Sequence, residues 1–325
     1  MPDTGAGGDD VIHDAPGFIR VYKSGRVERF LLIDFAPPCT DAATGVSSKD
    51  ITILPGAGVS ARIYLPPAPA GGQQGKLPVL VFFHGGAFCL GSAFDAAAHG
   101  HANQLASRAG AIVVSVEYRL APELPVPALY GDAWEALQWV AAHAGGQGGE
   151  EPWLTNHADF GRVHLGGESA GANIAHHAAM RAGAEELGHG VRVSSLVLIH
   201  PYFLGGDSSE SDEMGMALLD ELVRLWPVVC PGTSGCDDLW INPMAEGAPS
   251  LAGLGCKRAL VCVGGKDAMR GRGSLYYEKL IGSGWQGEVE IWEANGQGHG
   301  FHLFQPTCAQ AEAQVRVVAE FLGRR

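Results

Sequence analysis

A serine between glycines stands where the sequence changes from a strand pattern to a helix pattern. The G-x-S-x-G motif spans Gly167–Gly171, has Ser169 at its centre, and follows the apolar run Arg162–Leu165. A sharp strand-to-helix turn needs these glycines, because side chains there would collide with the neighbouring backbone. The turn presents the serine hydroxyl at the C-terminal edge of a sheet, near the positive end of the next helix. Ser169 is therefore the candidate nucleophile.

A second glycine-rich segment could stabilise the negative oxygen that forms when a nucleophile attacks a carbonyl group. The motif HGGAF at His84–Phe88 directly follows the apolar run Leu77–Phe83. Glycines leave backbone amides unobstructed, and losing one such donor typically costs ~10²–10³ in rate. We expect the amides of Gly85, Gly86 and Ala170 to form an oxyanion hole. A plain glycine turn after a strand is the alternative.

A carboxylate and an imidazole follow the serine in the chain order of a serine hydrolase. Asp267 comes shortly after the apolar run Ala259–Val263, and His299 comes shortly after the predicted strand Val289–Trp292. We expect His299 to take the serine proton and pass it to the leaving group. Asp267 would then hold the imidazole in one tautomer and stabilise the imidazolium.

Other residues could fill these roles. His302 is an alternative base, although the glycines on both sides of His299 leave that residue freer to reach Ser169. Glu293 is an alternative acid, although its place inside a strand favours a solvated position. Cys89 lies next to the HGGAF motif, but free cysteines are usually buried and packed like small apolar residues.

We expect no metal ion and no cofactor. The histidine pairs at 99/101 and 176/177 have no carboxylate or thiolate at ligand spacing. The H-x-x-H spacing of His299 and His302 lacks the glutamate of a zinc protease helix.

Composition limits the partners and the compartment. The net charge is −13, without a run of Lys and Arg, which argues against nucleic acid and favours a small-molecule ester as the partner. No apolar stretch is long enough to span a membrane or resembles a signal peptide. Seven cysteines without CxxC spacing indicate reduced thiols. We therefore expect a cytoplasmic protein, with entry into the nucleus left open.

Alternating strand and helix patterns must position these groups. Five apolar runs predict strands buried on both faces: Leu77–Phe83, Ala111–Val116, Arg162–Leu165, Ser195–Ile199 and Ala259–Val263. Three earlier segments predict an antiparallel edge: Val27–Phe35, Ile51–Leu54 and Arg62–Leu65. Helices are predicted over Asp132–His143, Gly171–Ala184, Ser274–Ser283 and Ala309–Leu322. The pattern indicates a single α/β domain over residues 1–325, with a mostly parallel eight-stranded sheet flanked by helices.

Two stretches do not fit this alternation, at about 1–30 and about 205–240. The second carries more apolar residues than a connecting loop needs, which favours a small helical cap over the site. One amphipathic helix packed on the core is the alternative. We expect four residues of the oxyanion loop and the cap to contact substrate: Phe88, Met216, Leu219 and Trp226.

Four ordered motifs give the chain a family likeness. It resembles the hormone-sensitive-lipase-like branch of the α/β hydrolases, and most of all the plant carboxylesterases, through HGGAF (84–88), YRLAPE (118–123), GESAGAN (167–173) and GHGFH (298–302). Further stretches such as SGRVERF (24–30) and HPYF (200–203) extend this likeness over nearly the whole chain. The resemblance implies the α/β-hydrolase fold, the triad and oxyanion amides named above, and a cap. Ala87 departs from the pattern, because many members have a third glycine there.

The expected activity is the hydrolysis of small to medium acyl esters through an acyl-serine intermediate. Two groups in the same family leave alternatives open. Gibberellin receptors resemble an esterase that has lost its catalytic histidine, whereas His299 is present here. Hydroxyisoflavanone dehydratases keep a similar triad and eliminate water, so the motifs alone do not separate them from an esterase. The YRLAPE segment is expected to brace the loops beneath the site.

Overall fold

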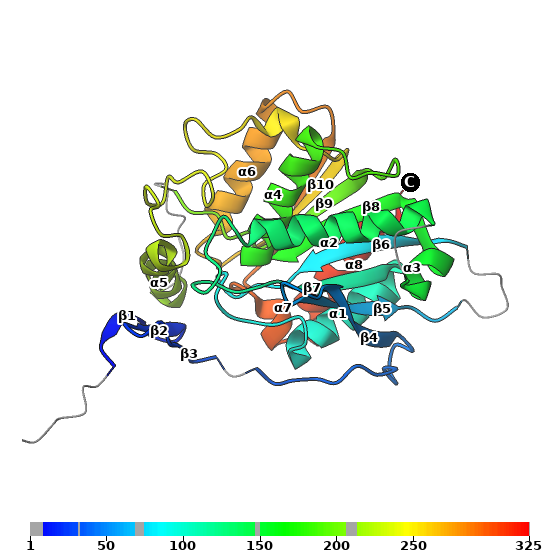
Figure 1. Cartoon of the computed structure of the whole chain (residues 1–325). Helices are drawn as coiled ribbons and strands as arrows, with labels where there is room; N and C mark the ends of the chain where they lie inside the picture. The colour runs from blue at the N-terminus through cyan, green and yellow to red at the C-terminus, as the bar shows by residue number, and fades with distance from the viewer. Residues whose placement is uncertain (1–8, 32, 69–74, 147–149, 206–212, 325) are drawn as a thin grey trace, which may run out of the picture.

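An eight-stranded sheet runs through the whole molecule (Figure 1). The structure is a computed structural model that describes residues 9–31, 33–68, 75–146, 150–205 and 213–324. The strands of the sheet are β4 (Ser47–Leu54), β5 (Val59–Leu65), β6 (Leu77–Phe83), β7 (Ile112–Glu117), β8 (Ala158–Glu168), β9 (Val193–Ile199), β10 (Arg258–Gly264) and β11 (Glu288–Ala294). Their order is β11-β10-β9-β8-β6-β7-β5-β4, parallel from β11 to β7 and antiparallel at β5 and β4. The mostly parallel eight-stranded sheet is confirmed.

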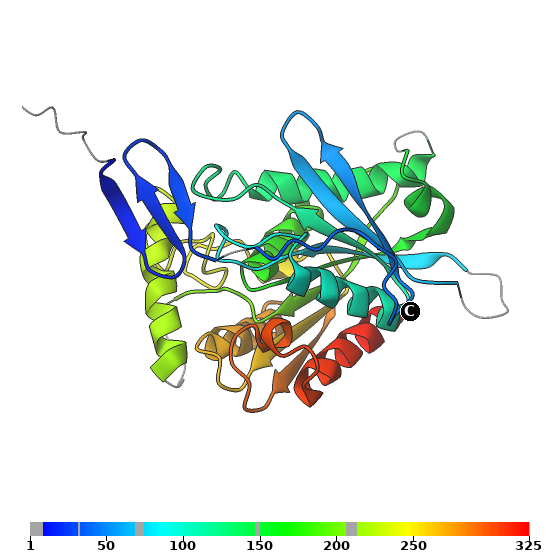
Figure 2. The same cartoon turned by 90° about the horizontal axis from the view of Figure 1, so that it is seen from below.

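Helices cover both faces of the sheet because its strands are apolar on both faces. On β6, Val79, Val81 and Phe83 belong to one core cluster, whereas Leu80 and Phe82 belong to a second cluster on the opposite face. The first cluster includes residues of α2 (Tyr130–Ala142), α4 (Ala170–Ala184) and α6 (Arg270–Gly282). The second includes residues of α1 (Ala96–Ala109) and α8 (Ala309–Gly323), which lie side by side in Figure 2.

Helix α1 was not predicted, because its sequence has a weak apolar pattern. It begins at Asp95, whose side chain accepts a hydrogen bond from the amide of Ala97, and ends at Gly110 in a left-handed conformation. Several of its buried residues are polar or small, so periodicity does not reveal its inner face. The short helices α3 (Pro152–His157) and α7 (Phe301–Phe304) and two 3₁₀ turns (His143–Gly145, Leu251–Gly253) also carry too little pattern to be predicted.

The N-terminal part of the chain differs from the expectation. The segment Val27–Phe35 does not join the main sheet, so its assignment to the antiparallel edge was wrong. Its strand β3 (Val27–Arg29) instead pairs in a separate three-stranded antiparallel sheet with β2 (Ile19–Tyr22), which also pairs with β1 (Val11–Ala15). Alternate residues Ile19 and Val21 reach the main core, and this period of two suits a strand.

The segments expected to form a cap lie next to each other in space. Figure 2 shows the small sheet β1–β3 beside helix α5 (Glu213–Val229), which contacts β1. Helix α5 buries Leu222, Leu225, Trp226 and Val229, at the spacing of one helix face, in the main core. Only the second segment is therefore helical. Residues 1–8 and 206–212 of the expected cap lie outside the described residues.

The first turn of α4 lies directly against the end of β6. A Cβ atom added to Gly171 would lie 2.0 Å from the carbonyl oxygen of Phe83. A Cβ atom on Gly167 would lie 2.2 Å from the carbonyl oxygen of Gly171. Both contacts are to backbone atoms, which cannot rotate away as a side chain can. The two motif glycines therefore set how closely α4, β8 and β6 approach.

We predict that Gly171→Ala lowers the free energy of unfolding by about 3 kcal/mol, because the added methyl group must push α4 away from β6. Gly131→Ala is the matched control, since Gly131 lies in α2 and an added Cβ atom meets no heavy atom within 4 Å. That control should gain up to about 1 kcal/mol from helix propensity. Urea denaturation measures both variants. A Gly171→Ala protein as stable as the wild type would contradict this account of the packing.

Candidate active site

Three side chains from distant parts of the chain form one hydrogen-bonded chain at the C-terminal edge of the sheet. Ser169, Asp267 and His299 follow the ends of the parallel strands β8, β10 and β11, which meet at one edge. The Nε2 atom of His299 lies 2.9 Å from the Oγ atom of Ser169. Its Nδ1 atom lies 2.8 Å from the Oδ2 atom of Asp267. The imidazole therefore bridges a hydroxyl group and a carboxylate.

The backbone at Ser169 is held in a sharp turn. Its φ of 52° and ψ of −118° lie in a region that non-glycine residues rarely adopt. Two backbone hydrogen bonds hold this conformation: the amide of Ser169 donates to the carbonyl of Ile199, and the amide of Tyr202 donates to the carbonyl of Ser169. The half-buried hydroxyl group is thus lifted out of the strand toward His299.

The surroundings of Asp267 and His299 keep the carboxyl group ionised and the imidazole basic. Burial alone would raise the pKa of Asp267, but the charge of His299 and its hydrogen bond outweigh this effect, so the pKa is lowered. The amide of Met269 also donates to Asp267 Oδ1 at 2.9 Å. Burial alone would lower the pKa of His299, but the charge and hydrogen bond of Asp267 raise it above the ordinary value. The imidazole is therefore prepared to accept a proton.

His200 holds the loop that carries His299, a role that the sequence did not assign. Its Nδ1 atom accepts a hydrogen bond of 2.9 Å from the amide of Gly300, and its Nε2 atom lies 3.2 Å from Gln314 Nε2. Burial lowers the pKa of His200 to about 3, so the ring is neutral and able to accept. The signal in the sequence is the motif HPYF directly after β9, which carries part of the family resemblance.

The oxyanion loop presents a different set of amides from the expected one. The amide of Gly85 donates to Glu168 Oε1 at 3.4 Å and so is directed away from the site. Within the described part of the chain, no group accepts a hydrogen bond from the amides of Gly86 and Ala87. Ala170 is the first residue of α4, so its amide has no partner inside the helix. Ala87 therefore replaces Gly85 in the set of available donors.

The reason for this shift is a left-handed turn in the loop. Gly86 has a φ of 112°, and a Cβ atom there would lie 2.1 Å from the carbonyl oxygen of Leu90. Ala87 and Phe88 follow with φ values of 51° and 65°. This turn rotates the amides after Gly85 into a new direction, which a glycine pattern does not reveal.

The YRLAPE segment braces this loop, as expected from the sequence. The hydroxyl group of Tyr118 donates to the carbonyl of His84 at 2.8 Å, and the His84 ring stacks on Tyr118 with centroids 4.3 Å apart. The amide of Ala121 donates to the carbonyl of Phe88 at 2.9 Å. Both ends of the loop are therefore tied to one neighbouring segment.

Arg29 of the small N-terminal sheet binds the same region. Its guanidinium donates to the carbonyls of Cys89 and Ala121 at 2.7 and 3.1 Å, and forms an ion pair of 2.7 Å with Glu123. The first segment of the expected cap is thus attached to the oxyanion loop.

Cys89, next to this loop, is not a reactive thiolate, because burial raises the pKa of its thiol to about 12.

The four expected substrate contacts fall into two pairs. Phe88 and Trp226 are 0% and 1% exposed, with ring centroids 6.0 Å apart. The indole N–H of Trp226 donates to Thr233 Oγ1 at 2.7 Å. These two rings therefore support the site from within the core. Met216 and Leu219 on α5 are half-buried, and a contact between them and substrate stays a prediction.

The alternative base and acid have other partners. His302 is buried, and its Nε2 atom lies 2.6 Å from Glu168 Oε2. Glu293 accepts a hydrogen bond of 2.9 Å from Arg270. Of the candidates, the structure brings His299 and Asp267 to Ser169 and leaves the other two elsewhere.

Two groups of histidine and acidic residues lie close enough together to hold a metal ion: His101, Glu168 and His302, and His200, Asp267 and His299. Each contains a histidine-to-carboxylate distance of 2.6 or 2.8 Å, which is typical of a charge-assisted hydrogen bond. Two ligand atoms that share one zinc ion at about 2.0–2.2 Å lie farther apart than this. We interpret both groups as hydrogen-bonded, and the absence of a metal stays an expectation.

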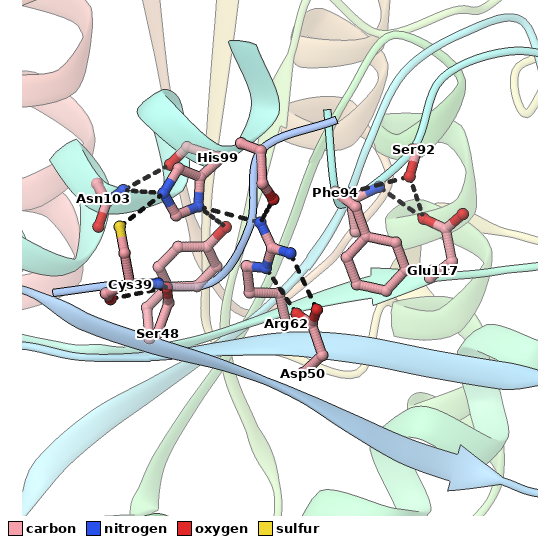
Figure 3. A network of polar contacts seen from close by, with 12 residues as sticks. Cys39, Ser48, Asp50, Arg62, Ser92, Phe94, His99, Asn103 and Glu117 are labelled. Carbon is pink, nitrogen blue, oxygen red and sulfur yellow. Dashed lines mark hydrogen bonds and ion pairs between the residues drawn. The ribbon is translucent and has the colours of Figure 1, made fainter. Parts of the chain in front are cut away.

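His99 does not pair with His101, because it belongs to a separate polar network (Figure 3). Its Nδ1 atom lies 3.0 Å from the hydroxyl group of Tyr64, and its Nε2 atom lies 3.1 Å from the side-chain amide of Asn103. The same network contains the fully buried Arg62, whose guanidinium pairs with Asp50 through hydrogen bonds of 2.6 and 3.0 Å. These contacts join α1 to the antiparallel edge.

Comparison with known proteins shows the family of the chain. A family model described as the alpha/beta hydrolase fold matches residues 80–303. The chain belongs to the α/β hydrolase family. It is 44% identical to a 2-hydroxyisoflavanone dehydratase of Glycyrrhiza echinata, over 96% of each chain. It is 40% identical to the probable carboxylesterase 4, mitochondrial, of Arabidopsis thaliana, over 96% of this chain and 84% of that protein.

Solved structures also match the fold of this chain. A hyperthermophilic esterase from the archaeon Pyrobaculum calidifontis superimposes with a TM-score of 0.65 and 30% identity, over 85% of each chain. The plant relatives confirm the resemblance found in the sequence, and together with the esterase neighbour they support ester hydrolysis by an α/β hydrolase. Among the helices that the structure describes, none has the length and apolar character needed to cross a bilayer.

We predict the pH dependence of serine labelling by a fluorophosphonate. Labelling requires neutral His299, so its rate falls as the pH drops through the pKa of this residue. Because that pKa is raised, the fall should be centred above the ordinary value of 6.5. In Asp267→Asn the raising charge is absent, so the fall should move to lower pH, and the plateau rate should drop by about 10³–10⁴.

The measurement is the labelling rate from about pH 5 to 9, followed by peptide mapping of the modified serine. Glu293→Gln is the matched control, because it removes the alternative acid and should change neither the plateau nor the midpoint. A wild-type midpoint below 6.5, or labelling of another serine, would contradict the assignment.

Proposed function

We propose that the protein is a carboxylesterase that cleaves small to medium acyl esters through an acyl-serine intermediate. The observation that carries the proposal is the hydrogen-bonded chain from Ser169 through His299 to Asp267, with distances of 2.9 and 2.8 Å. It lies beside the amides of Gly86, Ala87 and Ala170, which have no other acceptor in the described residues. This arrangement combines an activated nucleophile with donors for an oxyanion.

The first half-reaction transfers the acyl group to the enzyme. His299 Nε2 removes the proton of Ser169 as the hydroxyl oxygen attacks the ester carbonyl carbon. The carbonyl oxygen becomes negative and accepts hydrogen bonds from the three amides, while ionised Asp267 stabilises the imidazolium. When the tetrahedral intermediate collapses, the ester bond breaks and His299 passes its proton to the leaving alcohol.

The second half-reaction repeats these steps with water. His299 takes a proton from the water molecule, whose oxygen attacks the acyl carbon and forms a second oxyanion in the same place. Collapse returns the proton to Ser169 Oγ and releases the carboxylic acid. No metal ion or redox group is needed, because each step transfers only a proton and an acyl group.

The substrate should be apolar near its acyl group. Three buried aromatic rings, those of Phe88, Tyr202 and Trp226, support the wall of the site. The centroid of the Phe88 ring lies 5.6 Å from that of Tyr202 and 6.0 Å from that of Trp226. The half-buried Met216 and Leu219 on α5 extend this apolar surface in the proposed cap. The net charge of −13 also disfavours strongly anionic esters.

We predict that the purified chain hydrolyses p-nitrophenyl acetate and butyrate. The measurement is the release of p-nitrophenol, followed by its absorbance at about 400 nm. Ser169→Ala should abolish measurable turnover because it removes the nucleophile, and His299→Ala should lower kcat by about 10⁴-fold or more because it removes the base. His157→Ala at the end of α3 is a matched control that should keep full activity. Unchanged turnover in Ser169→Ala would reject the mechanism.

A dehydratase is the second candidate, because a 2-hydroxyisoflavanone dehydratase is 44% identical over 96% of the chain. In this case the same base would assist the loss of water from a 2-hydroxyisoflavanone. Incubation with that compound, with the product followed by mass, separates the two activities. Loss of 18 mass units at a kcat/KM above that for the nitrophenyl esters would make dehydration the main activity.

We retain the cytoplasm as the proposed location, supported by seven cysteines that are all free. Since one relative carries the word mitochondrial in its name, imaging of the chain with a C-terminal fluorescent tag decides the point. A pattern confined to an organelle would overturn the proposal.

A further inference from the structure

We propose that Glu168 is a positioning residue, and that its carboxylate together with His302 holds the oxyanion loop, the serine turn and the His299 loop in their working arrangement. The inference rests on the proposed function, because it concerns the same site. In the sequence, Glu168 is the second residue of the G-x-S-x-G motif, and His302 is an alternative base.

The two carboxylate oxygens reach two different loops. Glu168 Oε1 accepts a hydrogen bond of 3.4 Å from the amide of Gly85, the residue before the two available oxyanion amides. Glu168 Oε2 lies 2.6 Å from Nε2 of His302, three residues beyond His299. Glu168 itself directly precedes Ser169 in the chain. Glu168 therefore links the three segments that carry the oxyanion amides, Ser169 and His299.

The contact with the oxyanion loop is close as well as polar. A Cβ atom on Gly85 would lie 3.3 Å from the carbonyl oxygen of Glu168 and 3.3 Å from the Cβ atom of Ser169. The loop and the serine turn therefore touch at this point. The hydrogen bond from the Gly85 amide fixes the peptide plane between His84 and Gly85, and the chain enters the turn that carries the amides of Gly86 and Ala87 from this plane.

The carboxyl group of Glu168 is charged although it is buried. Only 4% of Glu168 and 2% of His302 is exposed. Burial alone would raise the pKa of Glu168, but the hydrogen bond and charge of His302 and the charge of His101 lower it to about 2. An uncompensated carboxylate beside the site would oppose the growth of negative charge on the oxyanion. The hydrogen bond from His302 offsets this effect.

A purely structural role predicts a different outcome from a positioning role. If the pair only stabilises the fold, removing it should lower the free energy of unfolding and leave kcat of the folded protein unchanged. If it positions the site, kcat should fall while KM stays nearly constant, because the misplaced amides serve the transition state more than the bound ester. Misplacement of a reacting group by about 1 Å can cost about 10² in rate.

The test compares Glu168→Gln, His302→Gln and His302→Leu in p-nitrophenyl acetate hydrolysis, with circular dichroism and urea denaturation as checks on folding. We expect Glu168→Gln and His302→Leu to lower kcat by about 10- to 100-fold, with KM within about twofold of the wild type. His302→Gln keeps an N–H donor near Glu168, so it should retain more activity than His302→Leu.

Asp50→Asn is the matched control. This substitution weakens a different ion pair, between Asp50 and the buried Arg62 at the antiparallel edge of the sheet (Figure 3). This variant should lose stability and keep its kcat. If the Glu168 and His302 variants behave like Asp50→Asn, with reduced stability and unchanged kcat, the positioning role is overturned.

Fluorophosphonate labelling of Ser169 separates this inference from the proposed function. If the wild type labels at Ser169 but hydrolyses no ester, the proposed function fails. The positioning role is then judged by the labelling rates, which should be about 10-fold lower in Glu168→Gln and His302→Leu. Equal labelling rates in folded variants and wild type would reject the positioning role whatever the natural substrate is.

Discussion

The site depends on how closely two pieces of backbone approach at the C-terminal edge of the sheet. No Cβ atom fits between Gly171 and the carbonyl oxygen of Phe83, so the first turn of α4 rests directly on the end of β6. This contact places the serine turn beside the loop that follows β6. The distance between the nucleophile and the oxyanion amides is therefore set by this contact, and a larger residue at Gly171 would increase it.

Buried charge is the second condition of the site. Two carboxylates lie under it, Asp267 and Glu168, and each has a histidine within 2.8 Å. Without these partners, burial would favour the neutral carboxyl groups and the imidazole of His299 would lose basicity. The neutral ring of His200 completes the arrangement by accepting the Gly300 amide. Reactivity at Ser169 thus depends on His302 and His200 as well as on His299, which is hydrogen-bonded to Ser169 itself.

The small N-terminal sheet and α5 support the site. Arg29 joins the small N-terminal sheet to the oxyanion loop, and α5 lies beside that sheet (Figure 2). The two segments expected to form a cap are therefore attached to the catalytic side through polar contacts and aromatic packing.

Much of this protein follows from local sequence. The apolar runs predict the parallel strands because these are buried on both faces, and the glycines around Ser169 and the order of Asp267 and His299 predict the triad candidates. Tertiary structure decided the rest. The Gly85 amide donates to Glu168 because the two loops pack together. Strand β3 pairs outside the main sheet, with β2, because Ile19 and Val21 of β2 pack in the main core. Helix α1 forms although its apolar pattern is weak. Contacts of this kind join residues tens of positions apart, and spacing along one chain does not encode them.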